Sequence, residues 1–123
     1  LQHVRRDELP EVIREMRRVI RPDGICSHTV ELHDHLGGNL NHLRFSERLW
    51  EWQFMAESGF YTNRYRLSQL LLLFEKEGFK PEIHSVEYWE NIPIPRLKMA
   101  TEFRMLSEED LLVKKFDVLL RPV

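Results

Sequence analysis

Between residues 8 and 20, apolar side chains recur every three or four positions, the spacing of one face of an α-helix. Asp7 is the predicted N-cap of this helix, and Pro22-Asp23-Gly24 is expected to end it and turn the chain. A strand is then predicted from Ile25 to Leu32, because its apolar and polar residues suit a pleated, half-buried surface. The apolar stripe of the helix consists of Leu9, Val12, Ile13, Met16 and Ile20.

The rest of the chain alternates between helical and extended patterns. Ser46 is the predicted N-cap of a helix reaching about Glu57, and a second helix is expected from Arg66 to Glu77, with Gly78 as its stop. Strands are predicted within 79–90 and over 111–120, with a short helix in 95–105 and a turn or helical start at 107–110. The order α-β-α-α-β-(α)-β predicts an α/β layer fold closed by a hairpin-like pair of strands.

Composition narrows the class of protein. The formal net charge of -2 gives no overall basic field, so nucleic acid is not a favoured partner. The single cysteine, Cys26, excludes an internal disulfide. The longest apolar run, Leu70 to Phe74, is far shorter than the roughly 20 residues of a membrane span, and no apolar signal-peptide core follows the N-terminal arginines. We therefore expect a cytoplasmic protein that does not associate with membranes.

Several motifs, taken in order, resemble the C-terminal half of a class I S-adenosylmethionine-dependent methyltransferase. Leu1-Gln2-His3-Val4 is similar to the segment after that family's fourth strand. Residues 15–24 resemble its helix and turn before the fifth strand, and residues 74–79 are similar to the helix end before the sixth. Residues 109–113 lead into what would be the antiparallel seventh strand. Residues 27–35, 43–46 and 63–66 resemble a subgroup of this family with poorly defined substrates.

The resemblance implies both a fold and an activity. The fold would be the C-terminal part of a Rossmann-like methyltransferase sheet, with strands five, six and seven, the last one antiparallel, and a helical cap insertion. A single partial domain would then contain a helix and the fifth strand (1–35), the cap (36–65), and a helix with the closing strand pair (66–123). The implied reaction is methyl transfer from S-adenosylmethionine, bound by the complete protein, to a small-molecule acceptor.

One part of the family pattern is missing. The glycine-rich turn that holds the methionine end of the cofactor does not occur in this chain, nor does the acidic residue expected at the ribose. Because the chain also begins at Leu1 without a methionine, we expect a fragment, inactive alone, whose partner is the N-terminal half of the domain. The edge of the 25–32 strand should then be unpaired, which favours self-association. A non-catalytic α/β interaction or dimerisation module is the alternative interpretation.

Ionisable side chains gather where the 25–32 strand ends. Ligands of open α/β sheets bind outside the carboxyl ends of strands, so His28, Asp34 and His35 are candidates for a catalytic general base. A metal site that also uses His33 and His42 is disfavoured, because no pattern of supporting residues around such ligands is visible in the sequence. The remaining interpretation is that these residues orient a lid loop through hydrogen bonds.

Two further groups of candidates complete the predicted site. Gln2 and His3 are assigned to cofactor binding by the resemblance, since they would follow the fourth strand. Arg44, Asn63 and Arg64 are the predicted substrate-binding residues. The arginines are chosen because guanidinium groups pair in a two-pronged manner with carboxylate or phosphate, and Asn63 because the segment 63–66 belongs to the resemblance.

Overall fold

The structure, a computed structural model, describes all residues from 1 to 123 and has an α/β fold. Two longer helices, α1 (Leu9–Val19) and α4 (Leu67–Lys76), accompany three strands, β1 (Cys26–Glu31), β2 (Phe79–Tyr88) and β3 (Val113–Pro122). No helix combines the length and the apolar composition needed to cross a membrane. The short helical elements are η1 (Asn41–Arg44), α2 (Glu47–Trp50), α3 (Gln53–Ala56), η2 (Arg96–Lys98), α5 (Thr101–Arg104) and α6 (Glu108–Leu112).

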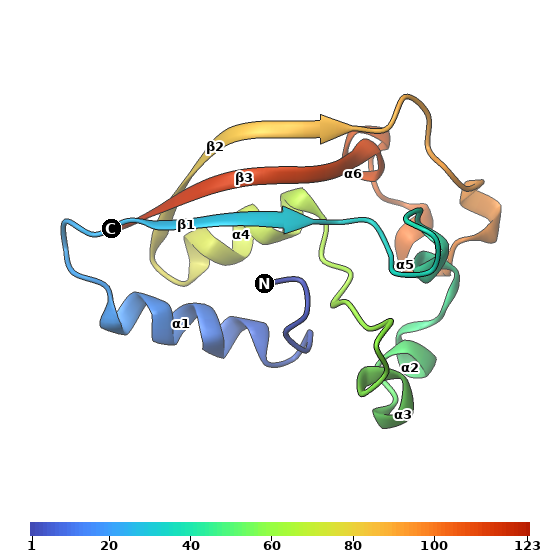
Figure 1. The fold of residues 1–123 in the computed structure, drawn as a ribbon, viewed down its shortest axis with the longest axis horizontal. Helices are drawn as coiled ribbons and strands as arrows, with labels where there is room; N and C mark the ends of the chain where they lie inside the picture. The colour runs from blue at the N-terminus through green and yellow to red at the C-terminus, as the bar shows by residue number, and fades with distance from the viewer.

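The three strands form one sheet in the order β1-β3-β2, and β3 is antiparallel to both neighbours (Figure 1). The strands β1 and β2 therefore run in the same direction, and each has a strand on one edge only. The expected closing pair, β2 and β3, is indeed antiparallel, but it is not hairpin-like. Residues 89–112 separate the two strands and form a small substructure of their own.

One face of the sheet carries the main core. The helices α1 and α4 contribute Leu9, Ile13, Leu70, Leu73 and Phe74, which pack with strand residues such as Val30, Phe116 and Val118. The opposite face is polar, and there the Asp117 carboxylate accepts hydrogen bonds from the hydroxyls of Thr29 on β1 and Ser85 on β2. Antiparallel sheets tolerate water on one face in this way, which explains the alternation of apolar and polar residues along β1.

A second core lies beyond the end of the sheet, where β1 and β2 finish and β3 begins (Figure 1). The backbone N–H of Ala100 donates to the Leu43 carbonyl over 2.7 Å and ties the loop after β1 to the segment between β2 and β3. This second core is made of Leu40, Leu43, Ile94, Met99, Phe103 and Leu111.

Local sequence signals explain most element boundaries. Gly78 ends α4 with a φ of 92°, a conformation that glycine adopts without steric penalty. Ser46 caps α2 by accepting from the N–H of Leu49 at 3.3 Å, as predicted. The helix expected to reach Glu57 is instead broken, because Trp52 has extended backbone angles (φ −59°, ψ 141°) and begins α3. Asp7 is not the N-cap of α1; Glu8 occupies that position and makes no side-chain capping bond.

Candidate functional site

The loop after β1 is organised around the buried carboxylate of Asp34. Its oxygens accept from the backbone N–H groups of Leu36 (3.1 Å), Asn39 (2.9 Å) and His42 (3.2 Å). Burial alone would raise the pKa of Asp34, but these three donors and the neighbouring His42 outweigh it and lower the pKa. The loop can fold back because Gly37 and Gly38 adopt positive φ angles of 109° and 75°.

His42 lies beneath this loop and is neutral at pH 7. Its side chain is 1% exposed, and Nδ1 has no hydrogen-bond partner although it lies 3.9 Å from a carboxylate oxygen of Asp34. Burial, together with the positive charges of Arg66 and Arg64, lowers the pKa of His42 to about 3, and Asp34 opposes this shift only in part. The ring contacts Trp50 edge-on, with centroids 6.0 Å apart.

Arg66 is fully buried and joins the ends of two strands. Its guanidinium donates to the carbonyls of Leu32 (3.0 Å), Val113 (3.0 Å) and Asp110 (3.4 Å). Burial lowers the pKa of Arg66 to about 10, with Asp110 opposing the shift, so the group stays charged at pH 7. The cation therefore fixes the carboxyl end of β1 against the start of β3.

Arg64 and Asn63 connect the cap to the rest of the chain. The Arg64 guanidinium donates to the carbonyls of His42 (3.0 Å) and Phe45 (2.7 Å) and lies over the rings of Trp50 and Phe103, at 5.2 and 4.7 Å from the centroids. Its backbone has a φ of 60°, which is uncommon for a residue other than glycine. Burial lowers the pKa of Arg64 to about 10, so it also stays charged at pH 7.

The Asn63 amide reaches the N-terminal segment. Its side chain donates to the carbonyls of Leu1 (2.9 Å) and Val4 (3.0 Å), and its backbone N–H donates to the carbonyl of Gln2 (2.8 Å). The predicted cofactor residue Gln2 and the predicted substrate residue Asn63 are therefore neighbours. The donors of the Asn63 side chain are already engaged with backbone carbonyls, which favours a positioning role.

Histidine rings meet at the surface near this junction. The ring of His3 stacks on that of His35 with centroids 5.2 Å apart, and His33 lies edge-on to His35 at 6.1 Å. The structure thus brings together His3 and His35, which lie far apart in the sequence. No group of three or more histidine, cysteine, aspartate or glutamate side chains is arranged to hold a metal ion.

The other candidates lie apart from this histidine group. His28 is half-buried on β1, its Nε2 has no partner, and burial together with the nearby amino group of Leu1 lowers its pKa. Arg44 is exposed at the end of η1 and its side chain makes no hydrogen bond or ion pair within the chain. Among the predicted residues, Arg44, His3 and His35 are thus the ones most open to a ligand.

Sequence reasoning missed Asp110, which binds the first turn of α4. Its carboxylate accepts from the N–H of Ser68 at 3.1 Å and from the Ser68 hydroxyl. The Ser107-x-x-Asp110 pattern is a helix-start signal, and this local role hides the longer-range contact with Ser68.

Comparisons of the chain with protein-family models, curated proteins and solved structures found no significant match.

Proposed function

We propose that this chain is the part of a class I S-adenosylmethionine-dependent methyltransferase that supplies the fifth, sixth and seventh strands. One observation carries the proposal: the last strand, β3, is antiparallel to two strands that run in the same direction, and β1 is left at an edge of the sheet. The resemblance implies an antiparallel last strand and places strands one to four beside the fifth. The free edge of β1 is available for that pairing.

The residues of this chain do not form a cofactor pocket by themselves. The glycine pair Gly37-Gly38 wraps the loop around Asp34, and Gln2 is engaged with Asn63 through its backbone carbonyl. Binding of the cofactor would therefore depend on residues outside this chain.

The contribution of this chain would be to the acceptor side. His3 and His35 are exposed imidazoles near the carboxyl end of β1, where they could take a proton from an acceptor. Arg44 is an unpaired guanidinium suited to an anionic group. In this proposal Asp34, His42, Arg64 and Arg66 position the loop and the cap, because their polar groups face the protein interior.

Calorimetry with S-adenosylhomocysteine tests the proposal. The 123-residue chain should show no binding, whereas a chain extended by the residues encoded upstream should bind with a Kd of about 1–100 μM. A His35→Ala variant of the extended chain should bind equally well, since that residue belongs to the acceptor side. An extended chain that folds and does not bind would refute the proposal.

A non-catalytic interaction module is the second candidate, favoured by two surfaces. The edge strand β1 is free on one side, and the rings of Trp52 and Phe54 are 61% and 72% exposed on the cap with centroids 5.6 Å apart. Light scattering after size exclusion discriminates between the methyltransferase part and the interaction module. Concentration-dependent dimers of the extended chain, without cofactor binding, would favour the module.

A further inference from the structure

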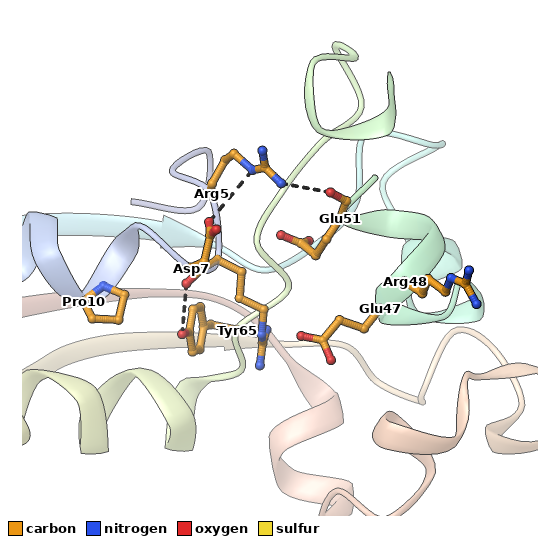
Figure 2. A pocket seen from close by; sticks show the side chains of 8 residues that line it. Arg5, Asp7, Pro10, Glu47, Arg48, Glu51 and Tyr65 are labelled. Carbon is orange, nitrogen blue, oxygen red and sulfur yellow. Dashed lines mark hydrogen bonds and ion pairs between the residues drawn. The ribbon is translucent and has the colours of Figure 1, made fainter. Parts of the chain in front are cut away.

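A cleft of about 500 Å³ lies between the segment that leads into α1 and the helix α2 (Figure 2). This volume is in the range of pockets that hold small molecules. Apolar contributions are confined to Pro10 and the ring of Tyr65. The charged residues around it are three arginines and three carboxylates: Arg5, Arg6, Arg48, Asp7, Glu47 and Glu51.

Most of these charged groups do not form ion pairs with one another. Only Arg5 and Asp7 form an ion pair, at 3.9 Å between Nε and the carboxylate. On α1, by contrast, Arg14 and Glu11 approach to 2.6 Å. The cleft therefore keeps unpaired positive and negative groups side by side.

Backbone contacts explain why Arg5 and Arg6 do not pair with Glu47 or Glu51. Arg5 donates to the main-chain carbonyl of Glu51 at 2.9 Å, and its Nε is buried without a hydrogen bond. Arg6 donates to the carbonyl of Asn63 at 2.8 Å, and its guanidinium lies 4.1 Å from the centroid of the Tyr65 ring. Both guanidinium groups are thus fixed in place before any ligand arrives.

Two carboxylates also line the cleft, that of Glu47 on α2 and that of Glu51 at the C-cap of the same helix. One oxygen of Glu51 accepts from the Tyr61 hydroxyl at 2.7 Å, while the other is buried and has no partner. The side chain of Glu47 makes no hydrogen bond or ion pair, and both carboxylates point into the cleft in Figure 2. An unpartnered buried carboxylate oxygen is costly. That oxygen of Glu51 is enclosed, so a donor in the cleft reaches it only when the Glu51 side chain turns, whereas Glu47 is reached directly.

We infer that this cleft binds a small zwitterion, a molecule carrying one ammonium and one carboxylate group. The ammonium would be held by Glu47 and Glu51, and the carboxylate by the guanidinium groups of Arg5 and Arg6. A simple anion would meet the carboxylates of Glu47 and Glu51, and a simple cation would meet the guanidinium groups of Arg5 and Arg6. An apolar ligand would find little more than one aromatic ring. Binding of a zwitterion does not depend on methyl transfer.

Amide chemical shifts of the 123-residue chain test this inference. The probes are glycine, β-alanine, 4-aminobutyrate and 6-aminohexanoate, which separate the two charges by increasing lengths, with butyrate and butylamine as single-charge controls. At least one zwitterion should shift cleft residues and bind about tenfold more tightly than both controls. Equal binding of butyrate or butylamine, or no shift with any zwitterion, would overturn the inference.

Two substitutions on the same helix separate specific binding from general surface charge. Glu47→Gln removes an unengaged carboxylate that points into the cleft, and it should weaken zwitterion binding about tenfold. Arg48→Gln is the matched control, because its guanidinium points away from the middle of the cleft (Figure 2) and should change affinity less than about twofold. Equal effects of the two substitutions would refute the assigned geometry.

Discussion

The buried imidazole of His42 should make the fold sensitive to mild acid. In the unfolded chain its pKa returns to the ordinary value of 6.5, whereas in the folded chain it is lowered to about 3. Between these values the unfolded state binds a proton that the folded state rejects. The free energy of unfolding should therefore fall as pH falls, by up to about 1.4 kcal/mol per pH unit from this group.

The size of the effect follows from the two pKa values. Between pH 7 and pH 4.5, the His42 contribution amounts to a loss of about 2.5 kcal/mol in the free energy of unfolding. The lowered pKa of Asp34 acts at lower pH, since its carboxylate stabilises the fold until it is protonated below the ordinary value of 3.8. The window from pH 6.5 to pH 4.5 thus lies above the range in which Asp34 acts.

Urea unfolding of the wild type and His42→Gln, measured by far-UV circular dichroism from pH 7 to pH 4.5, checks this reasoning. The variant should lose most of the acid dependence, whatever its stability at pH 7. His28→Gln should reduce the dependence by less, because His28 is only half-buried, and replacement of the exposed His84 should change stability by no more than about 0.5 kcal/mol. Parallel curves for wild type and His42→Gln would refute the assigned burial cost.

Two further substitutions test what stabilises the fold, each by urea unfolding at pH 7. Arg66→Met should lower the free energy of unfolding by about 3 kcal/mol, because the buried carbonyls of the strand ends lose their donor. Arg18→Met on the exposed face of α1, which breaks only the surface pair with Glu15, should cost less than about 1 kcal/mol. A similar loss in both would contradict the bridging role of Arg66. Phe74→Ala should cost about 3–5 kcal/mol since its ring is 0% exposed, and Phe54→Ala, at 72% exposed, should stay within about 0.5 kcal/mol. Comparable values for the two phenylalanines would contradict the assigned core.

Much of the fold is legible in the sequence because local signals agree with the final packing. The apolar stripe that includes Leu9 and Ile13, the stop at Gly78 and the alternation along β1 each specify an element within one or two residues of its observed limits. The break between α2 and α3 could not be predicted from local sequence signals. Trp50 points inward, where its indole donates to the carbonyl of Thr62 at 2.7 Å, and such a tertiary contact overrides local helix propensity.

The candidate site shows the same division. A polar cluster after β1 is visible as a pattern of residue types, but roles depend on which backbone groups come near. The carboxylate of Asp34 has the chemistry of a general base. In the structure it is the centre of a loop and accepts from three backbone N–H donors. The charged cleft is formed by residues 5–10 together with residues 47–51, about 40 positions further along the chain. No local sequence motif therefore predicts it.

The division into two hydrophobic cores determines which parts of the molecule can open locally. The sheet core is held by two helices and three strands, whereas the second core relies on short helices and on polar links such as Arg64 and Arg66. Regions with few apolar contacts exchange their amide hydrogens through local opening rather than global unfolding. The amide hydrogens of the second core should therefore exchange faster than those of β3.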